Sequence, residues 1–225
     1  MERFRAETEW TVIYGHIANI EVGSFVDAPY DVMQFGGVLQ LEYTLLGQPT
    51  VRSNRLRLGL EGGYASGDPN EEGLSPSEAL PTPRGLPGTE GLRTLSRFGF
   101  DPDYNVDLIL FEQILGRVSA AYYLRPWVDY TLGLGAGRSK KFLSFRLDVV
   151  WSRASEFVST ISNAADLGLE LDASVTFDTA DNFIARLQYG VFFPFGAFED
   201  QAEIRGAVTD LSNAQTVQAL LGVTF

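Results

Sequence analysis

The stretch LGLELDASVTF, from Leu167 to Phe177, alternates between apolar residues and polar or small ones. Its odd positions are all apolar, whereas its even positions carry Glu170, Asp172, Ser174 and Thr176 after a single glycine. Successive side chains of a β-strand point to opposite sides, and an α-helix cannot sort residues in this way. The stretch therefore predicts a strand with one wholly apolar face and one charged face.

The same alternation recurs along most of the chain and predicts an all-β protein of about eight strands. The connections between the strands are alternately short and long. This spacing indicates an antiparallel up-and-down sheet in one domain over residues 1–225, with every short turn at one end. The longest connection, 66–117, holds six of the ten prolines and is interpreted as a long loop or lid. The other predicted strands cover about 3–20, 33–46, 55–64, 118–134, 145–152, 183–193 and 217–225.

Composition excludes several classes of function. The 225 residues include no cysteine, so disulfides, thiolate metal sites and a cysteine nucleophile are excluded. The net charge of −12 argues against a nucleic-acid partner.

Alternation alone does not say which face lies inside, and a soluble barrel with an apolar interior is the first alternative. The apolar faces run without a charge, and aromatic residues gather near strand ends, as in the two girdles of a membrane-spanning barrel. Arginines and acids on the opposite face are suited to pair in a lumen. We therefore predict a transmembrane antiparallel β-barrel with outer-membrane lipid around it, short periplasmic turns and long extracellular loops. The aromatic residues are Phe35, Tyr43, Tyr122, Tyr130, Phe145, Trp151, Phe183 and Phe193.

The final residues, VQALLGVTF (217–225), resemble the carboxyl-terminal assembly signal of bacterial outer-membrane barrels. The resemblance implies location in the outer membrane of a Gram-negative bacterium and recognition by the barrel-assembly machinery. The matching positions are Val217, Ala219, Leu221, Val223 and Phe225.

A second resemblance is carried by EGGYASGDPN (61–70) and FGFDPDYNVDLILF (98–111). These segments are similar to parts of alginate-export-type barrels and related myxobacterial outer-membrane proteins. Barrels of that family are larger, so the chain is either a reduced relative or a fragment of a larger porin or polysaccharide-export barrel. The resemblance is not taken to imply that this chain exports a polysaccharide.

The charged faces predict a lumen lined by paired arginines and acids, and a structural or small-solute transport role. An eight-stranded barrel is just wide enough for its own side chains, which predicts a filled lumen. The predicted lumen network comprises Glu7, Glu9, Glu42, Arg55, Arg57, Glu61, Arg125, Asp129, Arg146, Asp148, Glu170, Asp172 and Arg186.

One motif suggests a cation. In DPDYNVD (101–107), Asp101, Asp103, Asn105 and Asp107 recur at every second residue, as oxygen ligands do at the start of an EF-hand loop. The glycine of that motif is missing, because Val106 occupies its position. Calcium is the only ion that the sequence suggests, and no organic cofactor is expected.

Catalytic residues are not expected, so the sequence predicts no enzyme. The single histidine, His16, lies on an apolar face, whereas Ser152 falls on a polar one, and no Gly-x-Ser-x-Gly elbow is present. The alternative is a lipid-modifying outer-membrane enzyme that uses His16.

Overall fold

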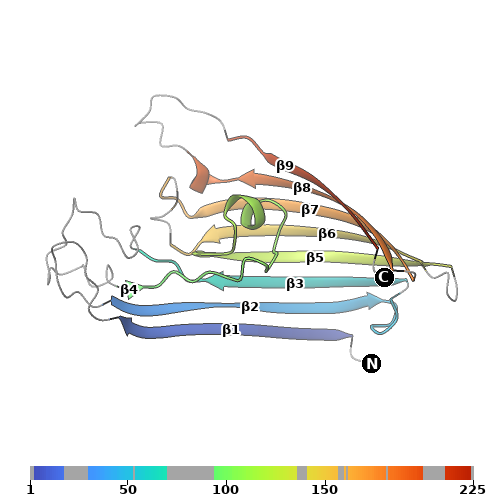
Figure 1. The fold of residues 1–225 in the computed structure, drawn as a ribbon, viewed down its shortest axis with the longest axis horizontal. Helices are drawn as coiled ribbons and strands as arrows, with labels where there is room; N and C mark the ends of the chain where they lie inside the picture. The colour runs from blue at the N-terminus through green and yellow to red at the C-terminus, as the bar shows by residue number, and fades with distance from the viewer. Residues whose placement is uncertain are drawn as a thin grey trace.

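The computed structural model describes residues 3–17, 30–52, 54–69, 94–135, 141–156, 160, 162–180, 182–199 and 211–223. Most of them belong to one curved sheet whose long strands are all antiparallel (Figure 1). Within these residues, no helix is long and apolar enough to cross a membrane.

The predicted long strands are confirmed, and each pairs with the next along the sheet. A short ninth strand, β4 (Thr94–Leu95), pairs in parallel with the start of β2. The long strands are β1 (Phe4–Ile17), β2 (Tyr30–Leu46), β3 (Arg55–Ala65), β5 (Ala121–Leu134), β6 (Lys141–Ala154), β7 (Asp166–Thr179), β8 (Phe183–Pro194) and β9 (Ala214–Val223).

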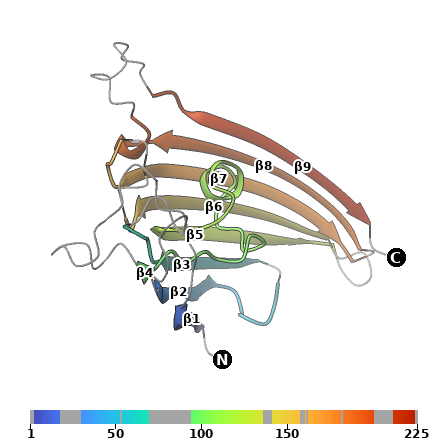
Figure 2. The same ribbon diagram turned by 60° about the vertical axis from the view of Figure 1, so that its left-hand side comes forward.

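The sheet is open, which departs from the predicted closed barrel. The strand order runs from β1 to β9, and within the described residues these two strands do not pair with each other. Figures 1 and 2 place them on opposite sides of the concave face. The start of β1, the end of β9 and the short connections from β2 to β3 and from β7 to β8 lie at one end of the strands, as the connection lengths predict (Figure 1).

Residues 98–118, here called the inner segment, cross the concave face of the sheet (Figures 1 and 2). The segment contains a single π-helical turn, η2 (Leu110–Ile114), and its two ends are joined by the hydrogen bond from Phe100 N to Val118 O, 2.9 Å long. The end of the predicted 66–117 loop is thus packed inside the sheet. Residues 70–93 of that loop lie outside the described residues.

The inner segment creates the apolar core. Val106, Leu110 and Phe111 are each at most 3% exposed. They pack in one cluster with residues of the strands that face the same way as the predicted lumen network, such as Val150 and Phe192. Where the inner segment covers it, the predicted charged face is therefore mainly apolar, with the buried acids Glu61 and Glu170 among the apolar residues, and it is polar toward the short turns.

Close packing at Gly63 gives a testable consequence for this core. A Cβ at Gly63 would lie 2.3 Å from the ring of Tyr123, whereas a Cβ at neighbouring Gly62 would meet nothing nearer than 3.7 Å. We expect Gly63→Ala to lower the free energy of unfolding by about 1–3 kcal/mol, because overpacking displaces the ring. Gly62→Ala is the matched control, and equal urea midpoints for the two variants would contradict this packing.

Candidate functional site

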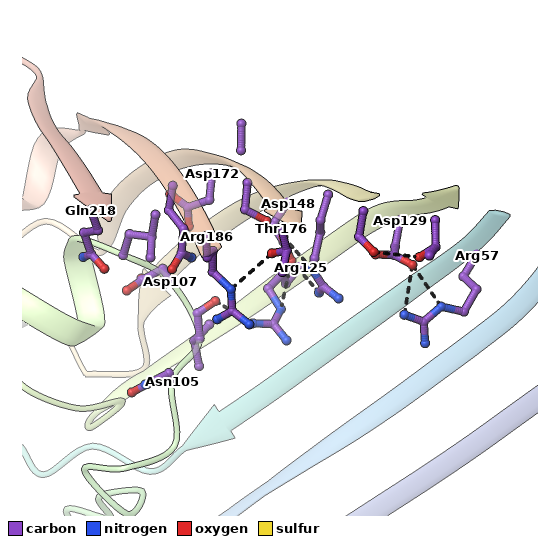
Figure 3. A pocket seen from close by; sticks show the side chains of 18 of the residues that line it. Arg57, Asn105, Asp107, Arg125, Asp129, Asp148, Asp172, Thr176, Arg186 and Gln218 are labelled. Atoms are coloured by element: carbon purple, nitrogen blue, oxygen red, sulfur yellow. Dashed lines mark hydrogen bonds and ion pairs between the residues drawn. The ribbon is translucent and has the colours of Figure 1, made fainter. Parts of the chain in front are cut away.

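A polar cavity of about 550 Å³ lies between the inner segment and the uncovered part of the concave face. Its walls come from β3, β5, β6, β7, β8 and β9, together with inner-segment residues such as Asn105 and Asp107 (Figure 3). Both signs of charge line it, since six arginines face five acidic side chains.

The first group of charges surrounds the indole of Trp127. The Arg57 guanidinium lies 2.9 Å from Asp129 and 3.3 Å from Glu42. Arg146 makes two bonds to Asp148, of 2.7 and 2.8 Å. Both guanidinium groups lie over the Trp127 ring, at 5.6 and 4.3 Å from its centroid. The two arginines thus share one aromatic ring, and each is paired with at least one acid.

Arg125 connects the sheet with the inner segment. Its Nη2 lies 2.8 Å from Glu61, its Nε lies 3.7 Å from Asp148, and its Nη1 donates to the carbonyl of Val106 at 2.6 Å. Glu61 is almost fully buried and also accepts a 2.7 Å bond from the hydroxyl of Tyr123. A single cation therefore neutralises a buried acid and positions the loop above it.

Glu170 fixes the other half of the inner segment. Its carboxylate accepts backbone N–H bonds from Leu108 and Leu110, of 3.0 and 2.9 Å. Asp107 accepts bonds from the backbone of Phe111 and Glu112, which satisfies donors at the start of η2. Asp172 lies beside this pair, and its buried Oδ1 has no hydrogen-bond partner among the described residues. Glu170 therefore binds backbone N–H groups in place of the arginine partner that the sequence predicts.

The remaining residues of the predicted network contribute less to pairing. Arg55 donates to the carbonyl of Pro49, and Arg186 donates to Thr176. On the edge strand β1, Arg5 pairs with Glu7, while Glu9 lies exposed on the same face. The network is therefore brought together around Arg57, Arg125 and Arg146, and it thins out toward the short turns and β1.

The predicted calcium ligands do not converge. Asp101 accepts a bond from the backbone N–H of Asp103 and lies exposed, whereas Asp107 is buried and binds backbone N–H groups. The described part of the chain contains no group of three or more His, Cys, Asp or Glu side chains able to hold a metal ion. Alternation over 101–107 fails to bring the oxygens together because the segment enters the core at Val106.

His16 lies near the end of β1, where its Nδ1 is 2.9 Å from Asp31. Both side chains are exposed, and no serine hydroxyl bonds to His16 within the described ranges. Ser152 is buried on the opposite face of the sheet, where its hydroxyl contacts the carbonyl of Gly168. Among the described residues, the structure therefore brings no nucleophile to this histidine.

The predicted assembly signal lies on β9. Val217, Leu221 and Val223 are strongly exposed, at 70%, 79% and 55%, and Ala219 shares their face. Phe225 lies outside the described residues.

Three residues of the site were missed by reasoning from the sequence. Trp127 and Tyr123 both lie on the polar face of β5. Arg52 lies in a turn, where it pairs with Asp178 and its guanidinium carbon is 4.5 Å from the ring centroid of Phe142. An aromatic residue at a lumen-facing position is the signal that could have identified the first two. Nothing in the sequence marks the pairing of Arg52, because its partner is distant in the chain.

The Asp107 carboxyl predicts a pH response of the inner segment. Burial, and then the nearby Glu170 charge, raise the pKa of Asp107 from 3.8 to about 7. A raised pKa means that the folded segment favours the protonated acid, so stability is greatest below about pH 4 and is lost as pH rises toward 7. We expect protease cleavage within the segment to accelerate from pH 4 to pH 8.

Asp107→Asn is the matched variant, since its amide oxygen still accepts N–H bonds and carries no charge at any pH. Its cleavage rate, corrected for the protease's own pH profile on an unfolded peptide, should rise less steeply than that of the wild type over the same range, because residue 107 no longer ionises. Parallel profiles for the variant and the wild type would contradict this account.

Comparison with family models, with curated proteins and with solved structures gave no match for this chain.

Proposed function

We propose that this chain forms a wall of a bacterial outer-membrane β-barrel, in which small polar solutes pass along the ion-paired cavity beside the inner segment. The observation that carries the proposal is the contrast between the two faces of one sheet. The concave face holds the charges, and the convex face holds large apolar side chains that no other described part of the chain covers.

The convex face is apolar across its whole width. Leu60, Leu124, Leu147, Val175 and Leu187 project from successive strands, and each is 38–55% exposed. A monomeric soluble protein rarely exposes a contiguous apolar patch larger than a few hundred Å². Lipid tails would solvate this face without cost, as they do in outer-membrane barrels.

Aromatic rings form a belt on the convex face near the long connections. Trp10, Phe35, Tyr64, Tyr122 and Trp151 come from five neighbouring strands, and adjacent centroids lie 5.3, 5.7, 6.5 and 5.9 Å apart. Such belts mark the level of lipid headgroups.

A second aromatic group lies toward the short turns, where the rings of Phe177 and Phe183 are 6.4 Å apart. On β5, Tyr122 and Tyr130 both face outward near opposite ends of the strand. Eight residues at about 3.4 Å each span about 27 Å along the strand, or about 21 Å of height at a tilt of about 40°, which is comparable with the ~25 Å apolar band of outer-membrane barrels. The spacing supports two girdles with lipid between them.

The interior supports passage of polar solutes and opposes free flow. Arginine and acid side chains offer hydrogen bonds to a hydrated solute along the cavity. The inner segment occupies part of the same concave face and narrows the path. A catalytic role receives no support from the described residues around His16, and we propose none.

A membrane-like solvent is the direct test. We expect the purified chain to remain folded in detergent micelles, with strand-rich circular dichroism and a gel mobility that changes on heating. In plain buffer the same protein should aggregate, because its apolar convex face would be exposed to water. A monodisperse, folded protein in buffer without detergent would refute the membrane location.

A further inference from the structure

The inner segment takes up space on the concave face, and this bears on whether the two edges of the sheet can pair with each other. An eight-stranded barrel is just wide enough for its own side chains. Here the concave face already carries Trp127, Tyr123 and the ion-paired arginines, and a separate stretch of backbone with a helical turn lies on top of them. A helical turn with its side chains is roughly 10 Å across. Closure of these eight strands on themselves would leave no room for it.

Within the described residues, each edge strand has a pairing partner on one side only. All fourteen residues of β1 are exposed, including inward-facing Glu7 and Glu9. At the other edge, β9 pairs through ten residues with β8 alone within the described chain. Unpaired backbone N–H and C=O groups cannot remain exposed to lipid, so a membrane-inserted sheet needs a partner at each edge.

The two edges fit each other in direction and in chemistry. The sheet path contains an even number of strands, so β1 and β9 run in opposite directions. Each presents apolar residues to the convex face, such as Trp10 and Leu221, and polar residues to the concave face, such as Glu9 and Gln218. The inward residues of β9 are uncharged, so pairing creates no like-charge contact with Glu7 or Glu9.

We infer that a second copy of this chain closes the barrel, with β9 of each copy paired in antiparallel fashion to β1 of the other. Two copies related by a twofold axis along the barrel give a ring of sixteen long strands, a size that leaves an aqueous interior. Each copy contributes its inner segment to this shared lumen, and the cavity is complete only when both copies are present. The inference rests on the proposed membrane function and adds the partner that this function requires.

Cysteine crosslinking tests the arrangement, because the natural chain contains no cysteine. Glu9→Cys is placed in a chain with one affinity tag, and Gln218→Cys in a chain with another. The two variants are refolded together in micelles and treated with a short bismaleimide. We expect a covalent dimer that carries both tags. Glu9→Cys mixed with Ser174→Cys is the matched control, because Ser174 lies in the central strand β7 and should give no such product.

Two outcomes would overturn the inference. Crosslinking within the double variant Glu9→Cys/Gln218→Cys, together with no mixed-tag dimer, would show that one chain closes on itself. No crosslink in either sample would show that other strands cover the edges. Both outcomes are interpreted only in samples that show the heat-dependent gel shift of a folded barrel, so they contradict the dimer and not the membrane location. Folding without detergent would instead contradict the membrane location.

Discussion

Glu170→Ala should release the inner segment from the sheet. The change removes the acceptor for the Leu108 and Leu110 backbone N–H groups, which lie in the buried core. Each hydrogen bond to a charged acceptor contributes about 1.5–3 kcal/mol. Relief of the repulsion between Asp107 and Glu170 offsets part of this loss. We therefore expect the segment to lose about 2–4 kcal/mol of local stability.

Chymotrypsin cleavage after Phe111 measures this release, because that side chain is 2% exposed in the closed state. When opening is fast, the cleavage rate follows the open population, so the loss corresponds to an increase of roughly 30- to 900-fold. Ser174→Ala is the control, since this residue lies on the same face of β7 and lines the cavity away from the core. Wild-type cleavage rates in Glu170→Ala would contradict the anchoring role.

Arg125→Ala should be among the most destabilising changes on the concave face. It leaves the Glu61 carboxylate, whose side chain is 3% exposed, without its 2.8 Å partner, and it frees the Val106 carbonyl. Breaking a buried pair from one side costs about 3–5 kcal/mol, because an uncompensated charge remains. Urea unfolding in micelles, followed by tryptophan fluorescence, measures the loss.

Two further variants separate charge from packing. Arg125→Ala/Glu61→Gln removes the stranded charge and should recover a large part of the stability. Arg186→Ala removes an exposed arginine whose bond is to Thr176, and it should change the free energy of unfolding by less than about 0.5 kcal/mol. Equal losses in Arg125→Ala and Arg186→Ala would contradict a special role for the Glu61 pair.

Local patterns of the sequence determined the strands. Stretches such as Leu167–Phe177 needed only the two-residue period of a strand, and the alternation of short and long connections determined the up-and-down order. The division into a charged and an apolar face also followed from parity alone. These features are local, so no distant part of the chain could change them.

The path of the inner segment was decided by tertiary structure alone. Read locally, prolines, glycines and acids at 66–117 indicate an external loop, and the spacing of Asp101 to Asp107 suggests a cation. In the structure Asp107 points inward, because the buried backbone N–H groups of the inner segment need acceptors. Asp107 accepts from Phe111, and Glu170 accepts from Leu110. The only local indication that the inner segment covers this part of the sheet is the presence of apolar residues, Val150 and Phe192, at inward-facing positions.

Closure of the sheet also lay beyond the sequence. Strand number can be counted from a pattern, but the curvature of a sheet depends on what its concave face must enclose. Here that face encloses a folded segment as well as its own side chains, and the described edges β1 and β9 remain apart. The sequence thus determined which residues face inward. Packing of these residues against the inner segment, which is a tertiary contact, goes with a sheet curved so little that β1 and β9 stay apart.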